Sequence, residues 1–183
     1  MTLKRAYLGL MAAAAMVAIT TGAPAKDRTL ASVHADVKER FHTVQHLSAQ
    51  DLKAFGSEDI VIFDVREKGE FAVSHLSNAI RIDPDMRPAE FMRKHADRIA
   101  GKTILVYCSV GVRSSALAAR LARVLKRQAD TRIYNLTGGI FQWHNDGRPL
   151  VQGAQSTRYV HPYNRSWGQL LSNRALISYT PKP

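Results

Sequence analysis

Cysteine is almost absent from this chain of 183 residues, because Cys108 is the only one. A single cysteine cannot form a disulfide within its own chain, so the disulfide framework of many small secreted domains is excluded. The lone thiol is then either a buried, inert side chain or a reactive one, since free cysteine is among the most buried residue types. The residues around Cys108 indicate whether its thiol is inert or reactive.

Long apolar runs are also missing, except near the N-terminus. Residues 6–19 are mostly apolar, follow the basic pair Lys4 and Arg5, and precede an Ala-Pro-Ala sequence. This run is shorter than the roughly 20 residues of a membrane-spanning helix. We therefore expect residues 1–25 to be a secretory signal peptide rather than an anchor. The expected product is a periplasmic protein that is soluble and not stably inserted in the membrane after cleavage.

Acidic residues are scarce beside basic ones, with 15 Asp and Glu against 26 Lys and Arg. This balance favours anionic small molecules, acidic partners or an anionic membrane surface. The basic residues are scattered without a run of five or more, and export makes nucleic acid an unsuitable partner. The seven histidines lack the cysteine or carboxylate spacing of a metal site, so we expect none.

Apolar runs of strand length alternate with amphipathic segments along residues 44–150. Residues 60–65 and 103–108 read as buried parallel strands, whereas residues 114–127 read as an amphipathic helix. Further strands are expected near 44–47, 78–82 and 131–136, and further helices at 26–42, 48–56, 87–100 and 138–147. The pattern predicts an α/β fold, with a central parallel sheet of about five strands covered by helices on both faces. Residues 26–150 would form this domain.

The last 33 residues, 151–183, lose the alternation but contain several aromatic side chains. Such a composition is unlike that of a disordered tail. We expect this C-terminal extension to pack back on the domain, and it offers a surface for a protein partner.

Cys108 lies where a predicted buried strand ends, shortly before a predicted helix begins. Ligands of parallel sheets bind beyond the carboxyl ends of the strands, and the amides of a helix N-terminus attract anions. The same field favours a thiolate over a thiol. Gly111 allows the loop to curl with a positive φ, and Arg113 adds a permanent charge suited to an oxyanion. The loop therefore predicts an anion cradle with a nucleophile at its floor.

Loop length separates two reactions that use such a cradle. Cysteine-based phosphatases place five residues between the cysteine and the arginine, whereas four lie between Cys108 and Arg113. A tighter ring suits a smaller guest, such as the outer sulfur of a persulfide. A phosphatase or an arsenate reductase is therefore the least favoured interpretation.

Three motifs in order resemble the rhodanese (sulfurtransferase) family. The loop has Cys108, Gly111 and Arg113 at the family's positions. Upstream, "DVREKGEFAVSHLSNAIRI" is similar to the motif that the family carries after a strand, and downstream "GGIFQWHNDGRPL" is similar to another. The similarity extends over about residues 44–150, and the order of the three motifs makes it specific.

The resemblance implies a single-domain enzyme with Cys108 as catalytic nucleophile and no metal or organic cofactor. The thiolate would take a sulfane sulfur from a small anionic donor such as thiosulfate, and a thiol or cyanide would accept it. The persulfide-binding loop would consist of Ser109, Val110, Gly111, Val112, Arg113 and Ser114. The alternative is a rhodanese-fold binding or sulfur-sensing module without physiological turnover. Ser109 departs from the family, because many members have a basic residue there.

Other polar residues of the motifs are expected to support the loop rather than react. Asp64, Arg66 and Glu70 would form one set of ion pairs and hydrogen bonds that steadies it. Ser114 and Ser115 are expected to cap the helix that follows.

Overall fold

The computed structural model describes residues 28–126 and 131–182. Its five-stranded sheet comprises β1 (Gln45–Leu47), β2 (Ile60–Asp64), β3 (Ile80–Arg81), β4 (Thr103–Tyr107) and β5 (Arg132–Leu136). Its first helices are α1 (Leu30–Arg40), the 3₁₀ turn η2 (Asp51–Ala54), α2 (Lys68–Val73), α3 (Pro88–Ile99), α4 (Val112–Leu125) and α5 (Gly139–Asn145). The C-terminal extension adds β6 (Leu150–Gln152), β7 (Gln155–Thr157), α6 (Arg165–Gly168) and η3 (Arg174–Leu176).

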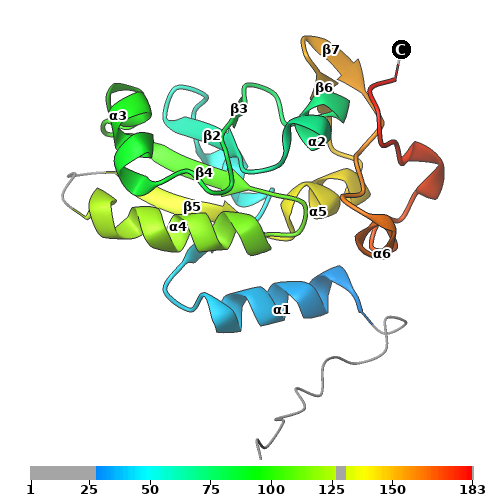
Figure 1. Cartoon of the computed structure of the whole chain (residues 1–183), viewed down its shortest axis with the longest axis horizontal. Coiled ribbons are helices and arrows are strands. Elements are labelled where there is room, and N and C mark those ends of the chain that lie inside the picture. Colours follow the sequence, from blue (N-terminus) through cyan, green and yellow to red (C-terminus); the bar gives the residue numbers. More distant parts are fainter. Residues whose placement is uncertain (1–27, 127–130, 183) are drawn as a thin grey trace, which may run out of the picture.

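The sheet has the order β1-β5-β4-β2-β3, and every pairing within it is parallel. β4 is therefore central, and its carboxyl end lies between those of β2 and β5 (Figure 1). The expected parallel sheet of about five strands is confirmed. The predicted signal peptide lies outside the described residues.

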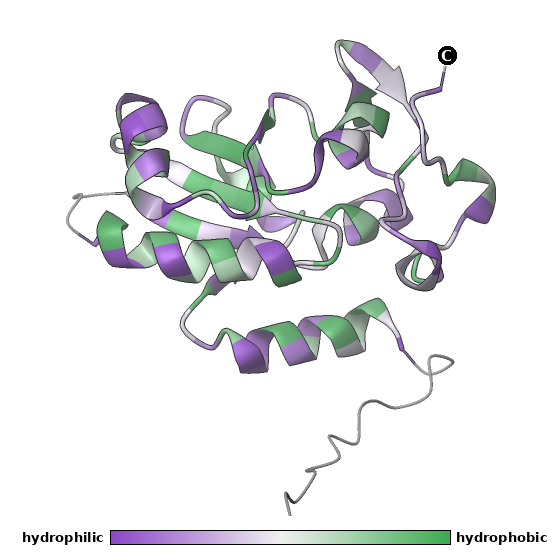
Figure 2. Ribbon diagram, viewed as in Figure 1, coloured by the Kyte–Doolittle hydropathy of each residue, from purple (hydrophilic) through white to green (hydrophobic). Residues whose placement is uncertain are grey.

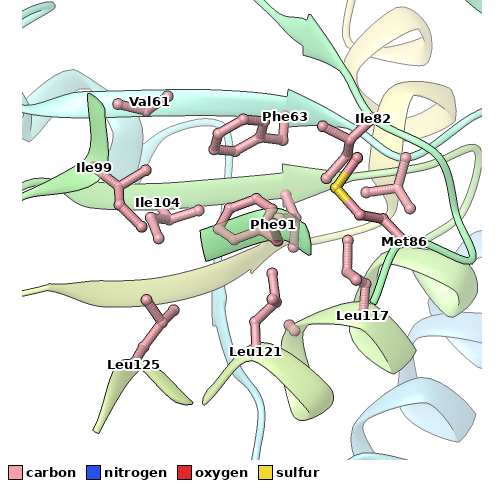
Figure 3. Packing of buried hydrophobic residues seen from close by; sticks show 13 residues of the cluster. Val61, Phe63, Ile82, Met86, Phe91, Ile99, Ile104, Leu117, Leu121 and Leu125 are labelled. Carbon is pink, nitrogen blue, oxygen red and sulfur yellow. The ribbon is translucent and has the colours of Figure 1, made fainter. Parts of the chain in front are cut away.

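Helices cover both faces of the sheet, and β4 divides its side chains between them. Ile104 and Val106 join a core with α3 and α4, where Phe91 and Leu117 are fully buried (Figure 3). Leu105 and Tyr107 join the opposite core with α1 and α5. Hydropathy alternates along α1 and α4, as expected of helices with one face on a sheet (Figure 2).

The C-terminal extension packs on the domain, as expected. It lies beside α5 in Figure 1, where it is coloured from orange to red. Val160 is fully buried and Leu171 is 2% exposed, and both belong to the core that contains α1 and α5. Asn145 ties α5 to the extension, because its Nδ2 donates to the Leu170 carbonyl and its Oδ1 accepts from the Ser172 amide.

Among the helices of the described residues, none has both the length and the apolarity that crossing a membrane requires.

Candidate active site

Cys108 is the first residue after the central strand β4, and its side chain is almost wholly buried, with the residue 1% exposed. The backbone then turns at Gly111, whose φ of 99° lies in the left-handed region that glycine adopts freely. The Gly111 amide donates to Cys108 Sγ across 3.2 Å. The expected positive φ at Gly111 is therefore confirmed, and the turn directs an amide at the sulfur.

Helix α4 begins at Val112, two residues earlier than expected, so Arg113 lies in its first turn. The expectation that Ser114 and Ser115 cap the helix is wrong. Gly111 is the N-cap residue, and no side chain caps it. Ser114 is fully buried and its hydroxyl donates to Asn135 Oδ1 on β5, so the serine joins helix to sheet.

A second helix, α5, holds the other side of the loop that follows Cys108. The Ile140 amide donates to the Cys108 carbonyl at 2.9 Å, and the Phe141 amide donates to the Ser109 carbonyl at 3.0 Å. This close approach requires glycine at position 139, because a Cβ there would lie 2.4 Å from the Cys108 carbonyl oxygen. The first turn of α5 thus fixes the loop through its backbone.

Glu70 on α2 reaches across to the loop and binds Arg113. The guanidinium donates to both carboxylate oxygens at 2.8 Å, and the Ser109 hydroxyl donates to Glu70 Oε1 at 2.8 Å. Burial alone would raise the pKa of Glu70, but the hydrogen bonds and charge of Arg113, with the charge of Arg66, lower it. Burial would lower the pKa of Arg113, yet Glu70 and the nearby Cys108 raise it. Arg113 is therefore charged and paired.

Asp64 and Arg66 form a separate, fully buried pair. Arg66 Nη2 donates to Asp64 Oδ2 at 2.6 Å, and it also donates to the Ser74 carbonyl. The Tyr107 hydroxyl donates to Asp64 Oδ2 at 2.7 Å and accepts from the Leu76 amide. Burial and the Asp64 charge raise the pKa of Tyr107, so the phenol stays protonated and keeps donating.

The sequence predicted that Asp64, Arg66 and Glu70 form one set of ion pairs and hydrogen bonds, but the structure divides them between two. Glu70 belongs with Arg113 and Ser109, on the loop itself, whereas Asp64 and Arg66 belong with Tyr107 at the ends of β2 and β4. The reason is geometric, because α2 carries Glu70 away from the strand end that holds the other two residues. Six of the nine predicted site residues besides Cys108 form the loop and Glu70 binds to it, whereas Asp64 and Arg66 bind Tyr107 beside it. The roles of all nine stay predictions.

A cavity of about 150 Å³ opens above Cys108. Its lining comes from the loop and the first turn of α4, and also from Tyr163 and Trp167 of the C-terminal extension. The Arg113 guanidinium lies over the Tyr163 ring, 4.8 Å from its centroid. The site is therefore completed by residues more than fifty positions downstream of the cysteine.

Sequence reasoning missed four residues of the site. Tyr107 and Asn135 were counted only as strand residues, although a polar group at the end of a buried strand signals a hydrogen-bond role. Tyr163 and Trp167 belong to the aromatic side chains of residues 151–183, and no spacing in the sequence connects them with the loop.

Around a small cavity, the arrangement offers a buried thiol, an amide that donates to its sulfur, and an arginine whose charge is paired with Glu70. Across residues 28–126 and 131–182, no three His, Cys, Asp or Glu side chains gather closely enough to hold a metal ion. The chemistry that these groups can perform is nucleophilic attack by sulfur, with the negative charge stabilised by the amide and the helix start.

Comparison with known proteins gives the family of the central segment. Residues 48–146, more than half of the chain, match the family described as rhodanese-like domain. The chain is 34% identical over 127 residues to a tRNA uridine(34) hydroxylase of Bacillus pumilus, covering 67% of this chain and 37% of that protein. A protein of the same name from Cytophaga hutchinsonii is 32% identical over 112 residues, covering 60% and 34%.

The chain thus spans little more than a third of the length of these curated relatives. Among solved structures, a thiosulfate sulfurtransferase from Pseudomonas aeruginosa superposes with a TM-score of 0.52 at 18% identity. That alignment covers 69% of this chain and 23% of the other, and it supports the fold alone.

Proposed function

The chain belongs to the rhodanese-like domain family, and from this premise we propose that it is a sulfurtransferase that carries a sulfane sulfur on Cys108. The observation that carries the proposal is the hydrogen bond from the Gly111 amide to Cys108 Sγ at the start of α4. An amide in this position stabilises negative charge on the sulfur before and after the outer sulfur is added.

The reaction has two displacements. The Cys108 thiolate attacks the outer sulfur of a donor, the donor's sulfur bond breaks, and its electron pair leaves with the remainder, which is sulfite when the donor is thiosulfate. The Cys108 persulfide then rests in the loop. An acceptor thiolate or cyanide attacks the outer sulfur, and the electron pair of the broken bond returns to Cys108.

The proposed setting is the periplasm, with a small sulfur donor and a thiol acceptor as partners. The N-terminal sequence pattern and the excess of basic residues support this setting. The reaction named for the curated relatives is that of proteins about three times as long as the matched part, and it forms no part of the proposal.

Intact-mass spectrometry of the purified protein after thiosulfate, and again after cyanide, tests the proposal. We expect the mass of one added sulfur atom on the wild type, removed by cyanide, and no such addition to Cys108→Ser. Turnover with thiosulfate and cyanide should fall by at least about 1000-fold in that variant, since the nucleophile is lost.

Two results would contradict sulfur transfer at Cys108. One is a sulfur adduct that persists in Cys108→Ser. The other is a folded wild-type protein that gains no sulfur from thiosulfate or from any organic sulfur donor, in which case the fold serves as a binding or sensing module.

A further inference from the structure

The C-terminal extension supplies the aromatic side of the Cys108 cavity. Tyr163 and Trp167 lie outside the family match at residues 48–146, yet they line the cavity with Val110 and Val112. Tyr163 is 44% exposed, which is high for a large aromatic residue in this protein. An exposed aromatic ring at the mouth of a cavity is available to contact a bound molecule.

Both rings are held in place. The Arg28 guanidinium lies 4.0 Å from the centroid of the Trp167 ring, and Arg113 lies over Tyr163. Tyr163 has a φ of 63°, a left-handed conformation that is strained for a non-glycine residue. Its amide donates to His161 Nδ1 at 3.0 Å, which supports this conformation.

Charge in the cavity disfavours a dianion. Among the lining residues, which all belong to the described part of the chain, Arg113 is the one basic side chain. Its charge is already paired with Glu70, whose side chain is only 3% exposed. A doubly charged donor entering here would lose hydration without gaining an unpaired cation.

The volume of the cavity suits a compact apolar group. A cavity of about 150 Å³ can hold a molecule of the size of benzene when its walls are apolar. Two valines and two aromatic rings provide most of the wall, and aromatic rings attract an unsaturated guest beyond the effect of burial alone.

We propose that Tyr163 and Trp167 are specificity-determining residues, which select a sulfur carrier with a compact, apolar, unsaturated body and at most one negative charge over thiosulfate. This inference rests on the proposed sulfurtransferase function and names the substrate class of the same site.

Three donors separate size, charge and reactivity. Benzenethiosulfonate and methanethiosulfonate each carry one negative charge, and each transfers its outer sulfur to the Cys108 thiolate and leaves as a sulfinate. Thiosulfate carries two negative charges and leaves as sulfite. The loading rate of Cys108 is measured by intact mass for each donor and divided by that donor's rate with free cysteine, which removes the difference in intrinsic reactivity.

In the wild type we expect the corrected rates to fall in the order benzenethiosulfonate, methanethiosulfonate, thiosulfate. The ratio of the first rate to the second should fall by about 5- to 10-fold in Trp167→Ala and in Tyr163→Ala, through loss of aromatic contact. Trp167→Phe and Tyr163→Phe retain a ring and should retain most of the ratio. Phe55→Ala removes a half-buried aromatic ring that belongs to neither the cavity lining nor the C-terminal extension, and should leave the ratio unchanged.

The inference is overturned if the ratio is the same in wild type and both folded alanine variants, or if thiosulfate has the highest corrected rate. Those results leave sulfur transfer at Cys108 intact. If no donor loads wild-type Cys108, the proposed function itself fails and the inference fails with it.

Discussion

At the scale of single residues, the position of Cys108 depends on a glycine in another helix. Gly139 has a φ of 60°, and the space beside its Cα is filled by the carbonyls of Cys108 and Ser109. The Cys108 loop and the first turn of α5 can hydrogen-bond only because no side chain separates them.

We therefore expect Gly139→Ala to lower the free energy of unfolding by at least about 2 kcal/mol, because it adds a clash with backbone to a strained φ. Denaturant unfolding measures this loss. Persulfide formation should slow as well, because the Cys108 carbonyl must move.

Gly147→Ala is the matched control, since Gly147 follows the end of the same helix with a φ of 68° and has no atom within 4 Å of its Cβ position. It should cost only the strain of a positive φ, about 1 kcal/mol, and leave the loading rate of Cys108 unchanged. Equal losses for the two variants would show that the close contact at Gly139 has no energetic role.

Residue spacing predicted part of this site and not the rest. The interval from Cys108 to Arg113 and the glycine within it indicated the loop, and the positive φ at Gly111 followed from the turn it must make. The ion-pair partner of Glu70 could not be predicted from the sequence, because Arg66 and Arg113 are equally acceptable until the path of α2 is known.

At the scale of secondary structure, apolar runs predicted the strands well because β2 and β4 are buried on both faces. The start of α4 was misplaced for a physical reason. Two consecutive serines are typical of a helix N-terminus, but here both are fully buried inside the first turns of α4. A left-handed glycine begins the helix instead.

Helix α1 and strand β1 meet through two histidines. The rings of His34 and His46 lie edge to face at 5.1 Å, and the amide of Asn135 contacts His46 Nδ1. Burial, together with the charges of His34 and Lys38, lowers the pKa of His46 to about 4. The folded protein therefore keeps this imidazole neutral where an unfolded chain would bind a proton.

Between the usual histidine pKa of 6.5 and about pH 4, the unfolded state binds more protons than the folded state. The free energy of unfolding should fall as pH falls through this window. We expect His46 to account for a decrease of about 1–2 kcal/mol, after allowance for its partial exposure. Urea unfolding at a series of pH values measures it.

His46→Gln should flatten the pH dependence in this window, whereas His42→Gln, which replaces an exposed neighbour, should not. A wild-type slope that survives in His46→Gln would assign the pH dependence to other groups.

At the scale of the whole molecule, the C-terminal extension is part of the folded domain and also part of its site. Its packing was expected from its aromatic content, but its place over Cys108 was not. The reason is that the path of the chain past α5 brings residue 167 to the cavity that Cys108 also lines, and no local sequence pattern determines that path.

A chain that ends at residue 158 should be less stable by at least about 3 kcal/mol, because it loses the burial of Val160 and Leu171 and uncovers apolar surface that they cover. Denaturant unfolding and light scattering measure the loss and the association that follows. A chain that ends at residue 180 keeps both side chains and should unfold almost as the full protein does. Equal unfolding midpoints for the chain ending at 158 and the full protein would show that the extension contributes nothing to the fold.

The burial of Cys108 has a consequence for crosslinking. A disulfide needs the two Cα atoms within about 7 Å of each other, so a second protein would have to bring its backbone to the floor of a cavity of about 150 Å³. With Trp167 and Tyr163 in place there is no room for a second backbone. The folded shape itself, without any reductant, keeps two copies of this chain from becoming covalently joined.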